Sequence, residues 1–492
     1  MAWIGQGLRA LIATPRDDAG RVPPWAWGVM AALAALVPAL WMWGFTVDDA
    51  LISVRYARHL ADGAGYRFNA SGPSTDGVTP LPWAFVLAPF AHAGALVVLG
   101  RAKALGIVVW TLTASAWGIY VGRARAPWWA KGVCMLALAV CIPCAAHAVS
   151  GMETSLATCL CTWAALLHAR PRAAAILSGL AASLRPELVP WAIIVAVGFE
   201  AVRGTTPARA LLAVVMAAFP FALCCAIRVV VFGHAAPLSL SAKPSDLMHG
   251  LAYVGAASLA SLAPALAFAP LALTRAERPA RVLAVAGLEH VVAVACAGGD
   301  WMPYARLAAP IVPSLLFAFV LVAPYVTMTA TVTRLVVAFA IAGWLDPKNA
   351  RALRAAGHDR ARMIEQAASL LRDSKRVAAL DIGWVSAVSE ASIIDLAGVT
   401  DPEVAVLPGG HTSKRIDAAF LLGREPDVAL FYSPCLPSTL EGVTPATFSR
   451  VVEARLAASS LFVQKFEPAT FLPLGNEGAG YVLYRRRVES RD

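Results

Sequence analysis

The chain has 492 residues, of which 59% are hydrophobic and only 15% are charged. Soluble domains carry about 25% charged residues, so the composition excludes an ordinary soluble protein and predicts one that crosses a membrane several times. The formal net charge of +10 does not indicate nucleic-acid binding, because most basic residues lie in short loops between apolar runs and no basic stripe with interleaved aromatic residues is present.

The N-terminal segment, residues 1–24, is expected to be a short cytoplasmic lead-in, because it is charged and lacks the hydrophobic core of a cleaved signal peptide. It is followed by apolar runs of the length that spans a bilayer. These runs cover residues 25–45, 103–122, 128–149, 153–169, 172–185, 187–203, 208–232, 250–273, 280–297, 307–325 and 327–345.

A further apolar run, residues 81–100, decides the predicted topology. It contains Pro82 and Pro89, and counting it as a span would place the cations of residues 122–131 on the outer face. Treating it as juxtamembrane returns these and the other loop cations to the cytoplasm, as the positive-inside rule favours. We therefore predict eleven spans over residues 25–345, with the N-terminus inside and the C-terminus outside.

In this topology the unusual polar motifs all face outward. The first outer loop, residues 46–102, is the longest. The other outer loops hold residues 150–154, 184–187, 232–245 and 298–306. Ionisable groups beside membrane spans are expensive to place and mark functional sites, so the sequence predicts a site at the outer leaflet.

The composition changes at Asp346, and residues 346–492 are predicted to form a soluble α/β domain. Residues 351–372 have helical periodicity, and four short apolar runs bounded by polar residues indicate strands. These runs cover residues 377–382, 391–396, 427–432 and 481–484. A segment of this size can form one compact domain with its own core.

The carboxylate pair Asp48 and Asp49 directly follows the first apolar run. At a membrane surface a carboxylate can act as a general base that takes the proton of an acceptor hydroxyl. An aspartate here also suits the N-cap of a helix over residues 50–63. Asp49 is better placed for the cap, so Asp48 is favoured for the chemistry while both remain catalytic candidates.

Several outer-face cations are candidates for binding a phosphate. They are Arg55, Arg185, Lys243 and Arg306. Guanidinium groups hold phosphate oxygens through paired hydrogen bonds, as the phosphate of a lipid-linked donor requires. The alternative is that these cations only meet lipid headgroups.

Three carboxylates at the ends of spans, Glu153, Glu187 and Asp300, are candidates for binding sugar hydroxyls, orienting an arginine or holding a divalent cation. Each could equally cap the helix that it precedes. Trp301 and Tyr304 add aromatic rings that could stack on a sugar, although interfacial aromatic belts are common. The sequence establishes no cofactor, and a divalent cation is compatible with these carboxylates.

Six motifs in order resemble one family, with the first outer loop and the tail each counted as one motif. In the first outer loop they are residues 48–60, 65–69 and 76–80, followed by residues 150–154, 184–187, 232–243 and 299–303, and by residues 381–383 and 395–402 of the tail. The chain resembles the bacterial GT-C glycosyltransferases, and within them the arabinofuranosyltransferase group of the mycobacterial terminal β-(1→2) type. It departs from that group at Val78, where an aromatic residue is frequent, and in residues 238–241, where asparagine is frequent.

The resemblance implies a GT-C fold, a polyprenyl-phosphate sugar donor, an outer-loop aspartate (Asp48 or Asp49) at the reaction centre and a periplasmic C-terminal domain. The expected activity is transfer of a sugar, arabinofuranose being one candidate, to a glycan or glycoprotein of the cell envelope at the outer face of the bacterial inner membrane. The sugar and acceptor stay open, because the departures fall in loops near them. Two alternatives remain: a transporter or flippase of lipid-linked sugars, and a non-catalytic envelope-assembly protein.

Overall fold

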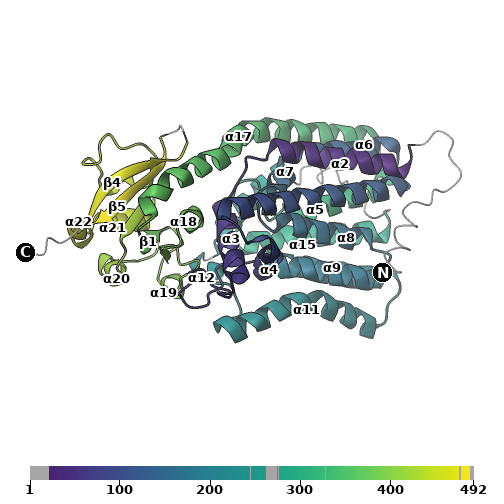
Figure 1. Ribbon diagram of the computed structural model, residues 1–492. Coiled ribbons are helices and arrows are strands. Elements are labelled where there is room, and N and C mark those ends of the chain that lie inside the picture. The colour runs from purple at the N-terminus through teal and green to yellow at the C-terminus, as the bar shows by residue number, and fades with distance from the viewer. Residues whose placement is uncertain are drawn as a thin grey trace, which may run out of the picture.

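The computed structural model describes residues 22–243, 245–261, 274, 276–326, 328–475 and 478–487. Most of the predicted N-terminal lead-in therefore lies outside the described residues. The chain forms a bundle of roughly parallel helices and a smaller α/β domain at one end of the bundle (Figure 1). This arrangement agrees with a helical membrane part followed by an α/β tail.

The bundle is built from apolar helices that pack through many alanines and other small residues. Small residues let helix backbones approach closely where hydrophobic burial gives no driving force. In chain order the helices are α2 (Pro24–Trp41), α5 (Ala95–Arg123), α6 (Trp128–Val140), α7 (Ile142–Ala148), α8 (Thr154–Leu166), α9 (Pro171–Leu184), η2 (Pro186–Leu188), α10 (Val189–Val202), α11 (Pro207–Phe232), α13 (Leu247–Ala260), α15 (Arg278–Cys296), η4 (Ala309–Ile311), α16 (Val312–Val322) and η5 (Ala323–Tyr325).

The structure does not support the predicted count of eleven spans. Within the described residues, four helices are long and apolar enough to cross a bilayer, namely α2, α5, α11 and α15, or five if the bent pair α6–α7 is one span. Helices α8, α9 and α10 have 13 or 14 residues. At 1.5 Å per residue such helices reach only about 21 Å, short of a hydrocarbon core of about 30 Å. The predicted run 250–273 is described only as far as Ser261.

Residues 46–102, the predicted first outer loop, form short elements that lie between the bundle and the α/β domain. Helix α3 (Asp48–Ala61) is followed by an irregular segment, then by α4 (Leu81–Leu87) and η1 (Ala88–Phe90). Since α5 begins only at Ala95, the run 81–100 does not form one continuous helix. The prediction that this run is not a span therefore agrees with the structure.

Helix α17 (Met328–Leu371) joins the two parts of the molecule. Its 44 residues include both the predicted last span and the predicted helix of the tail, so the expected boundary after residue 345 falls inside it. Figure 1 shows α17 running beside α2 and α6 and then continuing past the bundle into the α/β domain.

The α/β domain contains a five-stranded sheet of order β2-β1-β3-β5-β4. The strands are β1 (Arg376–Ala379), β2 (Ser392–Asp395), β3 (Val428–Ser433), β4 (Phe466–Pro473) and β5 (Gly480–Arg486). Strand β1 is parallel to β2 and β3, and β5 is antiparallel to β3 and β4. The helices of the domain are α18 (Ile382–Val388), α19 (Pro402–Ala405), α20 (Ala418–Gly423), η6 (Pro445–Thr447), α21 (Val451–Ala457) and α22 (Ser460–Lys465).

Four of these strands match the predicted runs, but β4 was not predicted. It contains Pro468 and Pro473, has a register irregularity between Pro468 and Thr470, and lies at one edge of the sheet. Proline cannot donate a hydrogen bond to a neighbouring strand and is tolerated only at sheet edges and bulges. A segment that contains two prolines therefore does not show the sequence pattern typical of a strand.

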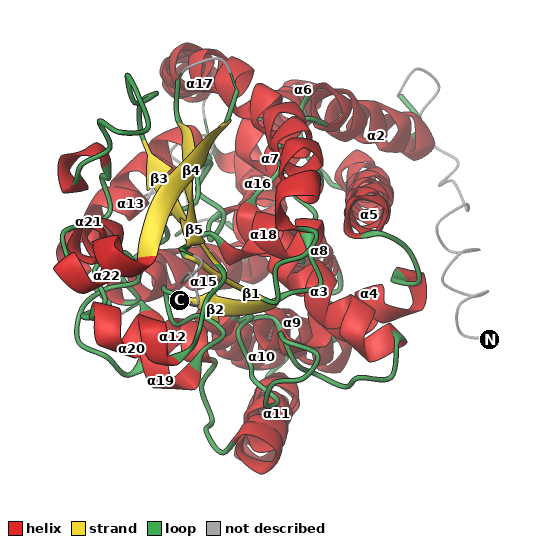
Figure 2. Cartoon of the chain, turned by 60° about the vertical axis from the view of Figure 1, so that its left-hand side comes forward, coloured by secondary structure: helices red, strands yellow, loops and turns green. Residues whose placement is uncertain are grey.

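The first outer loop fastens the α/β domain to the bundle. The Asn69 side chain donates to the carbonyl of Ile393 (2.9 Å) and accepts from its N–H (2.9 Å), so it pairs with the free edge of β2. Figure 2 shows α3 and α18 side by side between the sheet and the bundle. An edge strand that is covered in this way is protected from pairing with other chains.

Candidate functional site

Polar segments that are far apart in sequence meet where the bundle adjoins the α/β domain. Arg185 reaches Glu153, Arg306 reaches Asp49, and Arg228 at the end of α11 forms a buried ion pair with Asp76. The five loops that were predicted to share one face therefore do share one end of the bundle.

Asp48 lies on the side of α3 that contacts the α/β domain. Its carboxylate accepts hydrogen bonds from the N–H groups of Gly383 (2.8 Å) and Trp384 (2.9 Å), at the start of α18. Burial raises its pKa to about 6, with Arg360 opposing the shift and Asp381 and Asp49 adding to it. Asp48 therefore caps a helix of the other domain, and this use fixes both of its oxygens.

Asp49 faces the end of the bundle. Its carboxylate is 34% exposed and lies 4.0 Å from Nη1 of Arg306. The prediction that Asp49 caps its own helix is wrong, since the N-cap of α3 is Val47 and no side chain caps it. Of the two catalytic candidates, Asp49 is the one whose carboxylate remains accessible.

Arg306 is oriented by Asp300. Its Nε lies 2.7 Å from Oδ2 of Asp300, and both side chains are largely buried. Burial opposes the ionisation of Asp300, but Arg306, Lys243 and Arg185 outweigh it and lower the pKa of this carboxyl. The pair therefore stays ionised, and Nη1 of Arg306 is the nitrogen that approaches Asp49.

The backbone that positions Arg306 is strained. Tyr304 and Ala305 have φ values of 63° and 47°, in the left-handed region that residues other than glycine rarely adopt. Each such residue costs about 1–3 kcal/mol and persists only where its surroundings enforce it. Tyr304 packs its ring edge-on against Phe45 at 5.6 Å, so it supports the loop more than it offers a free stacking face.

Arg185 forms a second, buried network next to this pair. Its Nε lies 2.8 Å from Glu153 and its Nη1 lies 3.6 Å from Glu187. Its Nη2 donates to the hydroxyl of Thr154 (3.1 Å). Arg185 is 3% exposed and Glu153 is fully buried. This network ties the loop after α9 to the start of α8. Arg185 contributes positive charge to the site: its Nη2 donates to Thr154, while its Nε lies against Glu153 without forming a hydrogen bond.

Arg55 is not part of the cluster, which corrects the prediction that it binds the donor. It is buried, and its guanidinium donates to the carbonyls of Phe68, Ser389 and Ala391 at 2.7, 3.0 and 2.8 Å. These bonds hold α3 against the α/β domain. The guanidinium therefore has a structural use and is shielded from any donor.

The rim of the site is formed by Lys243 and by aromatic rings from both parts of the molecule. Trp301 is 65% exposed, stacks on His249 with ring centroids 4.0 Å apart, and lies 5.7 Å from the ring of His411. Burial lowers the pKa of His411 to about 4, and the charge of Lys243 adds to this shift. Neither histidine was predicted, because each is isolated in sequence and no spacing marks it.

The α/β domain places a second polar group near the same rim. Asp381, directly after β1, accepts from Nη2 of Arg450 (2.7 Å) and from the hydroxyl of Tyr481. Arg450 lies 4.6 Å from the ring centroid of Tyr432. In open sheets ligands bind beyond the carboxyl ends of parallel strands, and the loops after β1 and β3 face this position.

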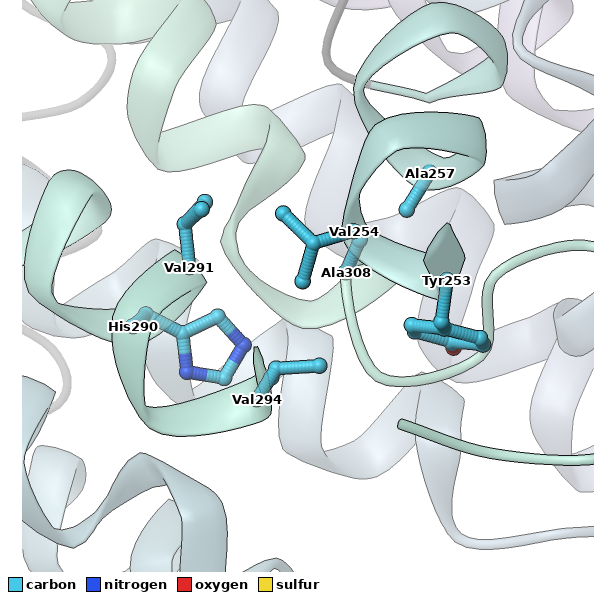
Figure 3. A pocket seen from close by; sticks show the side chains of 7 residues that line it. All are labelled: Tyr253, Val254, Ala257, His290, Val291, Val294 and Ala308. Atoms are coloured by element: carbon cyan, nitrogen blue, oxygen red, sulfur yellow. The ribbon is translucent and has the colours of Figure 1, made fainter. Parts of the chain in front are cut away.

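The described residues bring no three His, Cys, Asp or Glu side chains together as a metal site. Figure 3 shows a nearby cavity between Tyr253 and Val254 of α13 and His290, Val291 and Val294 of α15. Its volume is about 10 Å³ and its lining is apolar, so it holds at most one water molecule and cannot accept a sugar.

Comparison with protein families gives one match, a Domain of unknown function (DUF8728), over residues 349–484. This range includes the second half of α17 and the α/β domain as far as β5. Neither the curated proteins nor the solved structures give a match. The α/β domain is therefore similar to a recurring domain family whose activity is open.

Proposed function

We propose that the protein is a membrane glycosyltransferase that transfers a sugar from a polyprenyl phosphate to a hydroxyl of an envelope glycan or glycoprotein. The observation that carries the proposal is the accessible Asp49 carboxylate, 4.0 Å from an arginine that a buried aspartate orients. The resemblance to GT-C glycosyltransferases supports the same reaction and its location at the outer face of a bacterial inner membrane.

In the proposed step Asp49 takes the proton of the acceptor hydroxyl. The hydroxyl oxygen forms a bond to the anomeric carbon while the bond from that carbon to the phosphate oxygen breaks. The electron pair leaves with the polyprenyl phosphate. A positioned general base contributes about 100- to 10,000-fold to such a rate.

The departing phosphate requires positive charge that is not already used. Lys243 is half-buried and forms no ion pair among the described residues, and it lies close enough to lower the pKa of Asp300 and His411. We assign phosphate binding to Lys243 with Arg306, and a background electrostatic role to Arg185. Charges that are fixed before the reaction stabilise the leaving group without reorganisation.

Trp301 and the α/β domain are assigned to the sugar and the acceptor. The exposed ring of Trp301, backed by His249, gives a flat apolar surface of the kind on which sugar rings stack. Because His411 and Arg450 belong to the α/β domain, an acceptor held there would lie next to Asp49.

The test compares two neighbouring substitutions in the purified full-length protein. Asp49→Asn is expected to lower the release of polyprenyl phosphate from a polyprenyl-phosphate arabinofuranose donor about 100- to 10,000-fold, with thermal unfolding unchanged. Asp48→Asn is expected to retain turnover within about tenfold and to lower stability by about 1 kcal/mol, because an amide keeps only one of the two capping acceptors.

Full turnover by Asp49→Asn would remove the assignment of the base. The donor is tested separately on the wild type with a panel of polyprenyl-phosphate sugars and an added acceptor glycan. If the wild type releases polyprenyl phosphate from none of them but exchanges them across proteoliposomes, the transport alternative replaces the proposal.

A further inference from the structure

A cationic hollow is lined by residues of α17 that the proposed transfer step does not use. It has a volume of about 270 Å³ and lies between the chain at Gly44, just beyond α2, and one face of α17. Arg351, Arg354 and His358 of α17 line it. Among the side chains that the structure describes, no carboxylate pairs with any of these three residues.

A close backbone contact builds this hollow. The N–H of Gly357 donates to the carbonyl of Gly44 (3.0 Å), and a Cβ on Gly44 would lie only 2.0 Å from the carbonyl oxygen of Arg354. Only glycine fits such an approach, so α17 is held directly against the end of α2. The part of α17 that carries the two arginines and His358 is thereby held next to the chain that leaves a candidate span.

Aromatic side chains place the hollow at the depth of lipid headgroups. Trp41 and Trp43, at the end of α2, are 37% and 41% exposed. Exposed tryptophans at the end of a span are typical of the membrane interface. The guanidinium of Arg354 lies 4.4 Å from the ring centroid of Trp41, which orients it, and its Nε is buried without a hydrogen-bond partner.

We infer that this hollow, lined by Arg351, Arg354 and His358, binds the phosphate group of an anionic membrane lipid. Arginine matches phosphate oxygens in geometry and charge. The adjoining Trp41 and Trp43 offer an apolar surface to the glycerol and the first part of the acyl chains, which a free phosphate ion does not use. The inference is independent of the proposed transferase activity.

The experiment measures which lipids the full chain retains. Purified protein is reconstituted in nanodiscs of phosphatidylglycerol and phosphatidylcholine, released in mild detergent, and its bound lipids are counted by mass spectrometry. The wild type is expected to retain phosphatidylglycerol selectively. Arg351→Gln with Arg354→Gln is expected to weaken this retention about 25-fold, at about fivefold for each cation.

Two further variants keep the result interpretable. Arg351→Gln alone changes an exposed side chain and is expected to fold normally and to weaken retention about fivefold. The matched control, Arg362→Gln with Arg372→Gln, removes two exposed arginines outside the hollow, one on α17 and one directly after its last residue, and is expected to leave retention unchanged.

Equal retention of phosphatidylglycerol by the wild type and Arg351→Gln would overturn the site. A second arm adds inorganic phosphate at millimolar concentration. If phosphate displaces the lipid completely, the ligand is a free anion and the assignment to a lipid fails, whereas persistence of the lipid supports it.

Discussion

Asp395 in the α/β domain and Asp49 at the end of the bundle show two ways of placing a carboxylate. Asp395 is buried and accepts from the N–H groups of Ala397, Gly398 and Thr400 and from the hydroxyl of Thr400, at 2.6–3.1 Å. The carboxylate of Asp49 accepts no hydrogen bond from the described residues and lies 4.0 Å from Nη1 of Arg306. A carboxylate whose oxygens are all used stabilises a loop, whereas one with free oxygens can act on a ligand.

The same contrast separates two cations, one at the contact between the bundle and the α/β domain and one at the rim of the site. The guanidinium of Arg55 donates hydrogen bonds to backbone carbonyls where the bundle contacts the α/β domain. Lys243, in contrast, forms no ion pair among the described residues. The residues with unused donors and acceptors, Asp49, Lys243 and Trp301, gather at the rim between the bundle and the α/β domain. In a structural network the polar side chains already have hydrogen-bond partners, whereas in a candidate binding site some donors and acceptors are left for a ligand.

The largest stability effect is expected where the carboxylate is fully used. Asp395→Ala removes four accepted hydrogen bonds and leaves buried N–H groups without acceptors, so it should lower the free energy of unfolding of the α/β domain by about 3 kcal/mol. Hydrogen exchange of the β1 and β2 amides in the full-length protein measures this loss.

The matched control is Asp427→Ala. Asp427 accepts from the N–H groups of Lys375 (2.6 Å) and Arg376 (2.8 Å) in an exposed turn, so its loss should cost about 1 kcal/mol. Equal protection losses in the two variants would show that burial does not separate the two kinds of carboxylate.

A smaller effect, on substrate binding, is expected at the open rim. Trp301→Ala removes the exposed stacking ring and should raise the KM for the sugar donor about tenfold, with kcat within about threefold, because the ring contacts the ground state and the transition state alike. Trp301→Phe keeps an aromatic face and should restore most of the affinity. A KM that is unchanged in the alanine variant would place the sugar elsewhere.

The sequence predicts the two-part architecture, four of the five strands and the gathering of the polar loops at one end. It does not separate the roles of Asp48 and Asp49, because the partners of Asp48 are the N–H groups of Gly383 and Trp384, far along the chain. The role of Arg55 could not be predicted for the same reason, because its acceptors, the carbonyls of Ser389 and Ala391, are also far away in the sequence. Contacts between domains leave no local periodicity, so a pattern of nearby residues cannot reveal them.

The span count fails for a different reason. Hydropathy identifies the apolar run 153–169, but the polar network of Glu153 and Arg185 lies at its start, and the helix that forms, α8, has only 13 residues. The run 172–185 is short in the sequence already and forms the 14-residue helix α9. A run can therefore be apolar enough to be counted and still form a helix too short to cross a bilayer of ordinary thickness.

His411 connects the two regions, and its titration provides the smallest and most specific test. Burial, followed by the charge of Lys243, lowers its pKa to about 4 from 6.5, while Asp49 and Asp381 favour the proton and Arg450 opposes it. Since the unfolded chain binds this proton more tightly, the contribution of His411 to stability is complete above pH 6.5 and is lost as the pH falls towards 4. Stability should therefore fall on acidification in the wild type and fall less in His411→Gln.

The difference between the wild type and His411→Gln in the dependence of the unfolding free energy on pH isolates the contribution of His411. Asp48 titrates in the same range, but its pKa is raised to about 6, so its contribution to stability grows as the pH falls. His92→Gln, at an exposed loop, is the matched control and should follow the wild type. If His411→Gln also follows the wild type between pH 7 and 4.5, then His411 is not buried against Lys243 in solution. The α/β domain would then be positioned differently over Asp49, and the shared rim on which the contrast between the two regions depends would not exist.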